Sequence, residues 1–292
     1  MTKPIAILMP GDMGHGVGQA LIARGHDVIT ALEGRSAHTR GLADVAGIRD
    51  AGSIQNTVAE AGLILSIVPP DRAVGQARDL AAAMQATGTR PTYVDCNAIS
   101  PMTTRDVQAA LPDDTPFIDC GIIGLNPIKT PPTRFYVSGP DCTAMEALNS
   151  DAIKVVQIGE DIGAASALKM VYAAGTKGVW TLQTALLLTA ARQGVLEPLL
   201  SELDYSQSAQ LQAMRGRVPF LPADAPRWVP EMQEIAATFA DAGVTDGFHR
   251  GAADIFALLA KTPFAQETRQ TLDTSRTLEE ALAEYVKHLD NT

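Results

Sequence analysis

Lys169 lies in an apolar stretch of the chain, with Leu168, Met170 and Val171 beside it. Burying an ammonium group among such neighbours costs free energy unless the group has a partner or a task. One such task is general acid–base catalysis, because an ammonium supplies a proton and a positive charge to an oxygen that becomes an alkoxide. We expect burial to lower the pKa of Lys169 toward the working range. The alternative is a surface lysine whose stem covers apolar residues.

Other polar side chains have spacings that suit the same site. On a helix, Tyr172 and Thr176 share the face of Lys169, and Lys177 follows two turns further on. His249 stands beside Phe248, just before another helical pattern. We expect Tyr172 and His249 to orient a substrate, with plain packing as the alternative for each.

A glycine-rich turn follows the first apolar run of the chain and reads Met9-Pro10-Gly11-Asp12-Met13-Gly14. In the G-x-G-x-x-G pattern of dinucleotide-binding turns, Met9 takes the first glycine position, Gly11 the second and Gly14 the third. Glycines allow backbone N–H groups at a helix N-terminus to approach a pyrophosphate. We therefore expect Gly11, Asp12, Met13 and Gly14 to bind a nicotinamide dinucleotide, although an ordinary glycine-rich turn remains the alternative.

The segment after the second apolar run should contact the adenosine ribose of that cofactor. An acidic residue there favours the free 2′-hydroxyl of NAD(H), and Glu33 is near that position. Arginine and serine favour the 2′-phosphate of NADP(H), and Arg35, Ser36 and Arg40 are present as well. The sequence thus favours NADP(H), with NAD(H) as the alternative.

Five segments in chain order match one known pattern. They are Gly11-Asp12-Met13-Gly14, similar to a GxxMG turn; Val68-Pro69-Pro70; Asp95–Pro101, similar to D-x-S-T-x-S-P; Asp119–Gly124, similar to D-A-P-V-S-G; and Gly163 with Lys169, similar to G-x-G-x-x-x-K. Over roughly the first 190 residues, the chain resembles the β-hydroxyacid dehydrogenase and 6-phosphogluconate dehydrogenase superfamily. Asp246–Arg250 is similar to the C-terminal domain of a less characterised, phosphogluconate-dehydrogenase-like branch.

This resemblance implies hydride transfer between nicotinamide and a hydroxy or carbonyl carbon of a small organic substrate, acidic substrates included. It implies that Lys169 is the general acid or base. The remaining roles that it implies are cofactor contacts by Val68, Pro69, Pro70 and Asn97, and substrate contacts by Asn97, Ile122, Ile123 and Gly124.

The chain departs from the family pattern on the substrate side. Ile123 stands where the family has a substrate-binding serine, and Tyr172 and Ala173 replace two asparagines. Asn97 and Ala98 replace a serine and a threonine. Because isoleucine cannot hydrogen-bond a carboxylate, we expect small 3-hydroxyacids to be poor substrates. Two alternatives remain open, which are imine reduction on the same scaffold and a cofactor-binding sensor without turnover.

Composition excludes several other classes of protein. The 292 residues include 33 acidic and 23 basic ones, and a net charge of -10 argues against general nucleic-acid binding. Cys96, Cys120 and Cys142 form no metal-ligand pattern with the histidines, so no metal is expected. The longest apolar stretch, Val179–Ala191, contains Thr and Gln and is too short to span a bilayer. We expect a cytoplasmic protein that binds neither membranes nor nucleic acids.

Apolar runs alternate with helical patterns in the first part of the chain, which predicts a mostly parallel, doubly wound Rossmann sheet. The predicted strands are Ile5–Met9, Asp27–Ala31, Leu63–Val68, Thr92–Cys96, Phe117–Asp119, Phe135–Ser138 and Val155–Ile158. The predicted helices between them include Gly18–Arg24, Ala73–Met84 and Thr103–Leu111. The proline-rich segment Asn126–Pro132 is predicted to be a loop.

From Asp161 onward no strand pattern follows, which predicts an all-α domain over residues 161–292 after a Rossmann domain over 1–160. Asp161 is predicted to cap a long interdomain helix that runs to Arg192. Because that helix is apolar on nearly every face, we expect it to be buried all round, with a second subunit of a homodimer covering part of it. The further predicted helices are Glu197–Leu203, Pro230–Ala242, Asp246–Ala260 and Leu278–His288, with Pro219, Pro222 and Pro226 marking a loop.

Overall fold

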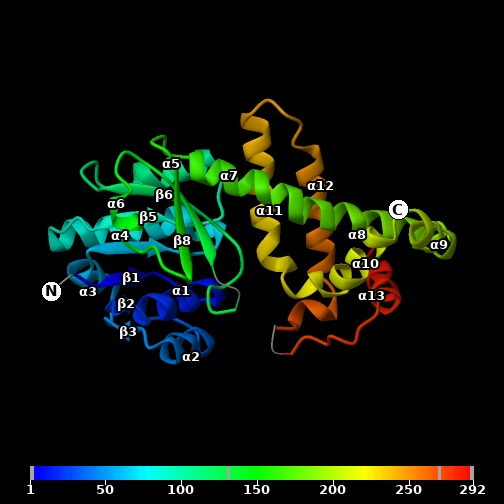
Figure 1. Ribbon diagram of the computed structural model, residues 1–292, viewed down its shortest axis with the longest axis horizontal. Helices are drawn as coiled ribbons and strands as arrows, with labels where there is room; N and C mark the ends of the chain where they lie inside the picture. Colours follow the sequence, from blue (N-terminus) through cyan, green and yellow to red (C-terminus); the bar gives the residue numbers. More distant parts are fainter. Residues whose placement is uncertain (1–2, 130–131, 269–270, 290–292) are drawn as a thin grey trace. The chain divides into compact units, whose positions relative to one another are not determined.

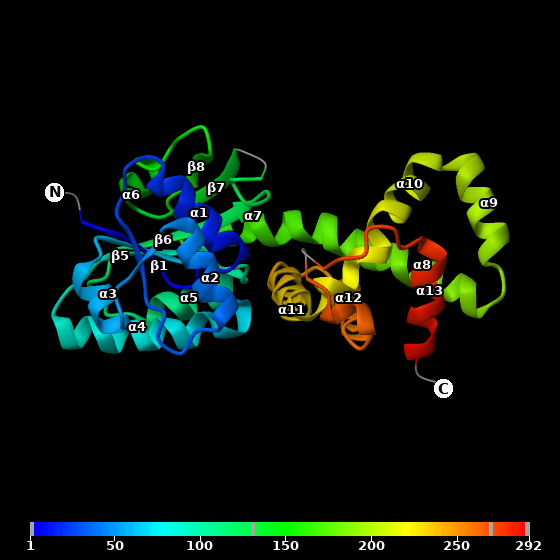
Figure 2. The same cartoon turned by 90° about the horizontal axis from the view of Figure 1, so that it is seen from below.

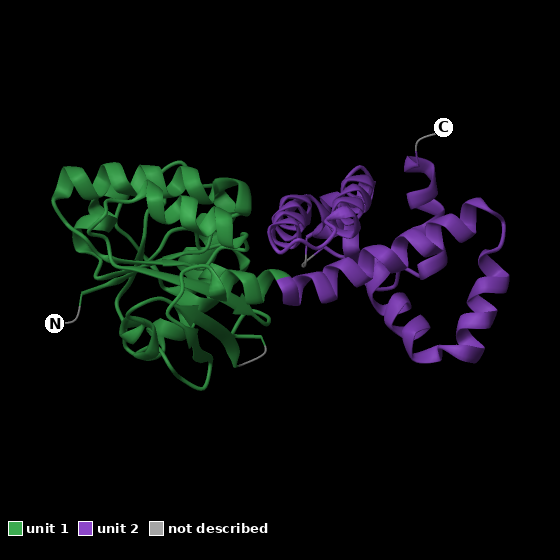
Figure 3. Cartoon of the chain, turned by 90° about the horizontal axis from the view of Figure 1, so that it is seen from above, with its two compact units in different colours: residues 1–170 green, residues 171–292 purple. Residues whose placement is uncertain are grey.

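The computed structural model describes residues 3–129, 132–268 and 271–289. The chain divides into two compact units, Met1–Met170 and Val171–Thr292, coloured separately in Figure 3. The division falls inside helix α7 (Ala164–Ala173), so a single helix contributes residues to both units. In the part of the chain that the structure describes, no helix has both the length and the apolar character needed to cross a membrane.

The first unit is built on one eight-stranded sheet (Figure 1). Its strands are β1 (Ile5–Ile7), β2 (Val28–Thr30), β3 (Arg49–Asp50), β4 (Leu63–Ser66), β5 (Thr92–Asp95), β6 (Phe117–Ile123), β7 (Thr133–Ser138) and β8 (Ile153–Gly159). Their order is β3-β2-β1-β4-β5-β6-β7-β8, and every neighbouring pair is parallel except β6 and β7. The predicted α/β class is therefore confirmed. The strand order reverses at β1, because β2 and β3 extend the sheet on one side of β1 and β4 begins its extension on the other side. Folds of this kind bind ligands at this point.

Helices cover both faces of this sheet (Figure 1). They are α1 (Asp12–Ile22), α2 (Ala37–Ala46), α3 (Ile54–Glu60), the 3₁₀ turn η1 (Pro70–Arg72), α4 (Ala73–Thr87), α5 (Pro101–Ala110), α6 (Thr143–Glu146) and the start of α7. Alternation along β1 sends Ile5 and Ile7 into the core shared with α1 and α2. Ala6 lies on the opposite face, in the core shared with α4 and α5. Apolar residues on both faces explain why the strands read as continuous apolar runs.

The seven predicted strands are present, and an eighth was missed. β3 consists of Arg49 and Asp50, which are both exposed, so no apolar run in the sequence predicts this strand. The predicted loop Asn126–Pro132 is irregular over residues 126–129 and at Pro132, while Thr130 and Pro131 lie outside the described residues.

The second unit is helical throughout its described secondary structure (Figure 2). Its elements are the π-helical turn η2 (Ala174–Gly178), α8 (Val179–Arg192), α9 (Leu196–Ser206), α10 (Ser208–Arg217), η3 (Val218–Ala223), α11 (Ala225–Asp241), α12 (Gly247–Leu259), η4 (Pro263–Gln266), α13 (Leu278–Tyr285) and η5 (Val286–His288). The predicted all-α character of this part of the chain is confirmed.

The long helix predicted from Asp161 to Arg192 is wrong in two respects. It begins at Ala164, and Asp161 contributes only a backbone carbonyl to the N–H of Ala164. The π-helical turn η2 interrupts it at a segment that contains two poor helix formers, Gly175 and Gly178. Within one chain part of this helix is exposed, with Leu182 at 68%, and its burial by a second subunit stays a prediction.

The prolines of the second unit were also misassigned. Pro219 and Pro222 belong to η3, and Pro226 is in the first turn of α11, so these residues do not mark an irregular loop. Helix α11 begins at Ala225 and includes Pro230 in its interior. Proline is tolerated in a first helical turn, where the N–H has no partner in the helix. Helix α10 was missed because its sequence is polar apart from a few residues such as Leu211 and Met214.

Candidate functional site

The turn between β1 and α1 has the geometry of an anion-binding helix N-terminus. Gly11 caps α1 in an extended conformation, and its carbonyl accepts hydrogen bonds from the N–H and Nδ1 of His15. A Cβ on Gly11 would meet only the Cε atom of Met9, at 3.7 Å. Gly11 therefore faces open space. The N–H groups of Met13 and Gly14 lie in the first turn of α1, where no carbonyl partner exists within the helix, and they can receive an anion.

Gly14 serves a different purpose in the same turn. A Cβ there would lie 2.3 Å from the carbonyl oxygen of Met9 and 3.2 Å from Cγ2 of Ile7. The third glycine therefore permits close packing of α1 against the end of β1. Gly11 thus leaves access for a ligand, whereas Gly14 allows contact between helix and strand.

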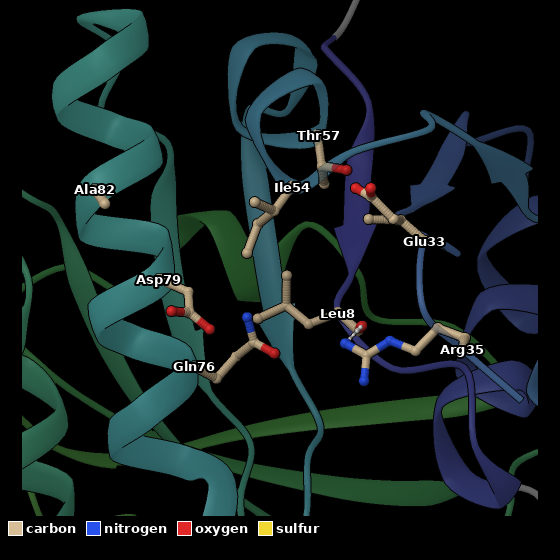
Figure 4. Close-up of a pocket in the computed structure, with 9 residues that line it drawn as sticks. Leu8, Glu33, Arg35, Ile54, Thr57, Gln76, Asp79 and Ala82 are labelled. Carbon is tan, nitrogen blue, oxygen red and sulfur yellow. Dashed lines mark hydrogen bonds between the residues drawn. The ribbon is translucent and has the colours of Figure 1, made fainter.

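A cavity of about 360 Å³ opens beside this turn, at the carboxyl ends of β1 and β2. Figure 4 shows Glu33 and Arg35 on one side of it and Gln76 and Asp79 of α4 on the other. The Nη2 atom of Arg35 donates a hydrogen bond to the carbonyl of Leu8, over a distance of 3.3 Å. The structure thus brings two sequence-predicted cofactor residues, Glu33 and Arg35, into one cavity.

Ser36 and Arg40 shape the loop beside this cavity. Ser36 is the N-cap of α2, where its Oγ accepts a hydrogen bond from the N–H of Thr39 at 3.2 Å. Arg40 donates to the carbonyls of Leu32 and Arg35. These contacts hold the backbone that positions Arg35 at the cavity.

Asn97 and Val68 join the ends of β4 and β5. The Oδ1 atom of Asn97 accepts a hydrogen bond from the N–H of Val68 at 2.7 Å, and its Nδ2 donates to Oγ of Ser66 at 3.2 Å. Only 2% of Asn97 is exposed, so its amide is engaged in shaping the loop that continues into Pro69 and Pro70. The predicted direct contact of Asn97 with cofactor or substrate stays a prediction.

Lys169 is brought close to strand β6 by a glycine that sequence reasoning did not single out. A Cβ on Gly121 would lie 2.6 Å from the carbonyl oxygen of Ala165 and 2.9 Å from Cβ of Lys169. A glycine inside a strand often marks such a close backbone approach, and this signal was available in the sequence. Lys169 is half-buried there, while Ile122 is buried and Ile123 is half-buried at the end of β6. Gly124 follows with φ +129, a conformation that favours glycine.

Asp119 anchors the start of the helix that bears Lys169. Its Oδ2 atom accepts hydrogen bonds from the N–H groups of Gly163 at 2.9 Å and Ser166 at 3.0 Å, and from Oγ of Ser138 at 3.2 Å. Its Oδ1 accepts from Oγ of Ser166 at 2.6 Å. A carboxylate from β6 thus does the work of an N-cap side chain for α7. Burial raises the pKa of Asp119, and these hydrogen bonds oppose that effect.

The second unit contains the other two predicted substrate residues. Tyr172 is exposed, whereas only 6% of His249 is exposed. The His249 ring packs edge-on against Phe239 and has no hydrogen-bond partner at Nδ1. Burial lowers the pKa of His249, because desolvation disfavours the charged imidazolium.

Lys177, the other basic residue of this helical segment, is already engaged. Its Nζ donates a hydrogen bond to Oε1 of Glu231 at 2.7 Å, and both side chains are largely buried. Its ammonium also lies 5.6 Å from the centre of the Trp228 ring. Lys177 therefore has a structural partner in its own unit. Among the described residues, no group of three or more His, Cys, Asp or Glu side chains is arranged to hold a metal ion.

Two family models match the chain. Residues 5–149 match the NAD binding domain of 6-phosphogluconate dehydrogenase, and residues 190–259 match a domain of unknown function, DUF1932. The first unit thus contains an NAD-binding domain that belongs to the 6-phosphogluconate dehydrogenase family, and the predicted resemblance is confirmed. The branch is the one whose C-terminal domain is DUF1932.

Individual proteins resemble the chain in sequence or in fold. An uncharacterized 28.5 kDa protein of Methanothermus fervidus is 26% identical over 181 residues, which cover 62% of this chain and 68% of that protein. The conserved protein MTH1747, described as structurally similar to 3-hydroxyacid dehydrogenases, is 29% identical with a TM-score of 0.64, covering 88% of this chain and 96% of its own. A reductive aminase from Aspergillus terreus in complex with NADPH has the same fold at 18% identity, with a TM-score of 0.55 and coverage of 94% and 98%. The chain has a hydroxyacid-dehydrogenase-like fold.

Proposed function

We propose that this protein is an NADP(H)-dependent oxidoreductase that transfers a hydride between nicotinamide and a hydroxy or carbonyl carbon of a small organic substrate. One observation carries the proposal: the first unit contains both the glycine turn and Lys169. The glycine turn at the reversal point of the sheet binds the cofactor, and Gly121 with Asp119 holds Lys169 against β6. Lys169 acts as the general acid or base.

The residues of the turn and the cavity fit a nicotinamide dinucleotide. Gly11 leaves room for an anion at the first turn of α1, and the cavity at Glu33 and Arg35 lies where the adenosine end belongs. The bound cofactor supplies the hydride. The residues of the chain position the cofactor and exchange the proton. The first-turn N–H groups hold the pyrophosphate, and Lys169 gives a proton to the substrate oxygen or takes it.

Arg35 supports NADP(H) as the preferred cofactor, because a guanidinium at this position pairs with a 2′-phosphate. Arg35→Ala is expected to weaken NADPH binding by about 10- to 100-fold, the effect of losing hydrogen bonds to a charged group. NADH binding should change by less, and both affinities are measured by fluorescence titration. Arg24→Ala, at an exposed arginine after α1, is the matched control. Equal losses for the two cofactors, or a wild type that uses only NADH, would assign the choice to Glu33.

Ile123 supports a substrate that is larger or less polar than the small 3-hydroxyacids. The wild-type protein is tested with NADPH and NADH against a wide panel of aldehydes, ketones, keto acids and imines, and in the reverse direction against hydroxyacids. We expect turnover of carbonyl compounds and little turnover of 3-hydroxyisobutyrate or 3-hydroxypropionate, because Ile123 offers no donor to a carboxylate. Efficient oxidation of either hydroxyacid would contradict the assignment of Ile123. Cofactor binding without turnover of any compound would indicate a sensor.

Imine reduction is the second candidate reaction. The apolar side chain of Ile123 suits it, and the shared fold includes a reductive aminase. Lys169 argues against it, because an ammonium beside a developing iminium is repulsive. The imines of the panel decide between the two reactions.

We also propose that two copies of the chain associate through α8. Val179, Leu182 and Leu186 are exposed and fall on one face of this helix by their spacing. A second copy would bury this apolar face, and a symmetric dimer is the commonest assembly. We expect sedimentation velocity at micromolar concentration to show a dimer for the wild type and a monomer for Leu182→Glu. A wild-type monomer would refute the proposal.

A further inference from the structure

The loop after β6 is fastened to the cofactor turn by one asparagine. Asn126 lies in a loop 114 positions from Asp12, yet its Nδ2 donates a hydrogen bond to the carbonyl oxygen of Asp12 at 2.6 Å. Its Oδ1 accepts from the N–H of Ile128 at 2.9 Å. These two partners define the orientation of the amide, because only a donor can face a carbonyl and only an acceptor can face an N–H. With 3% of the residue exposed, Asn126 is locked in place.

Gly16 makes this contact sterically feasible. A Cβ on Gly16 would lie 2.0 Å from Oδ1 and 2.3 Å from Nδ2 of Asn126. Any larger residue at position 16 would therefore push the amide away from the carbonyl of Asp12. Gly16 lies outside the G-x-G-x-x-G pattern and has no role in that motif, so the contact with Asn126 accounts for it.

The bond from Asn126 also bears on the pyrophosphate-binding groups. The carbonyl of Asp12 and the N–H of Met13 belong to one planar trans peptide, in which the two groups point in opposite directions. The Met13 N–H is one of the first-turn donors of α1 that lack a partner within the helix. The hydrogen bond from Asn126 to the Asp12 carbonyl thus fixes the direction in which the Met13 N–H points.

We propose that Asn126 is a positioning residue for the cofactor, which orients the Met13 N–H toward the pyrophosphate and couples the loop after β6 to the dinucleotide turn. Gly16 is its required partner. The inference rests on the proposed function only in taking NADPH as the ligand. A nucleotide that lacks the pyrophosphate, such as 2′-AMP, does not use the Met13 N–H and is therefore insensitive to Asn126.

The test is a double-mutant cycle in NADPH affinity, with Asn126→Ala, Gly16→Ala and the double variant. Each single change removes one hydrogen bond from the same place and should weaken NADPH binding about fivefold. The double variant should also lose about fivefold instead of the roughly 25-fold that independent effects would give, since the Cβ at position 16 fits the space that Asn126 vacates. Gly216→Ala, at an exposed helical glycine with open space around it, controls for the substitution type.

Binding of 2′-AMP and the thermal midpoint are measured on the same proteins. We expect 2′-AMP affinity to stay at the wild-type value in every variant, which a general loss of structure would not allow. If one variant fails to fold, the other tests the contact from the opposite side. Unchanged NADPH affinity in folded variants, or equal losses for NADPH and 2′-AMP, would overturn the inference. A wild type that binds no NADPH would instead refute the proposed function.

Discussion

Lys169→Met is expected to lower the rate of single-turnover hydride transfer by roughly 10²–10⁴, the usual share of general acid–base catalysis. Methionine retains the length and the apolar stem of lysine but has no proton to give. NADPH affinity should stay within about a few-fold of wild type, because the cofactor turn is formed by other residues, Gly11 to Gly14. Stopped-flow mixing of the enzyme–NADPH complex with a substrate from the panel measures the rate.

The pH profile of the wild type should bear the signature of a lysine. A lysine ammonium is a competent general acid at neutral pH, and lysine acts as a base only in its neutral form. Reduction should therefore persist at neutral pH, while oxidation should accelerate as the pH rises and more of the amine is neutral. Lys169→Met should remove this dependence of the oxidation rate on pH.

A matched control separates catalysis from a general effect of losing a lysine. Lys154→Met makes the same change at an exposed position of β8 and should leave both rates unaltered. If Lys169→Met transferred hydride at nearly the wild-type rate, the role of Lys169 would be limited to packing. The proton would then have to come from Tyr172, His249 or water.

Gly11→Val is expected to weaken NADPH binding on the order of 10²-fold or more, with a thermal midpoint close to that of the wild type. The backbone of Gly11 has φ -75, which valine tolerates, and its Cβ would meet no atom closer than 3.7 Å. The branched side chain would instead occupy the approach to the first-turn N–H groups. Losing two hydrogen bonds to a charged group accounts for a loss of this size.

Gly14→Val should behave differently although it alters the same turn. Its Cβ would lie 2.3 Å from the Met9 carbonyl, so we expect the variant to lose NADPH binding together with stability. Fluorescence titration and thermal unfolding of both variants test the distinction. Wild-type NADPH affinity in folded Gly11→Val would mean that the turn does not receive the cofactor.

The local pattern of the sequence determined the architecture of the first unit. Apolar runs such as Leu63–Val68 predict strands because a parallel sheet buries both faces of each strand. The glycine turn was recognisable because phosphate binding requires a helix N-terminus directly after a strand. Lys169 stood out for a similarly local reason, namely the apolar character of its neighbours in the chain. Each of these signals extends over a few consecutive residues. The predicted ranges of β1 and β4 differ from the observed strands only at their ends, whereas α1 begins at Asp12, six residues before the predicted start at Gly18.

Only the tertiary structure decided which side chains support these residues. Asp119 caps α7 from a strand that is 44 positions away from Gly163, and Asn126 reaches Asp12 across 114 positions. Gly121 and Gly16 are small because other segments pack against them, and no neighbour in the chain indicates which segments those are. The exposed face of α8 likewise depends on packing, because the apolar residues of a helix do not indicate which of them the folded unit leaves exposed. Contacts between residues far apart in the chain depend on how the folded elements approach one another, and a pattern of adjacent residues contains no record of that approach.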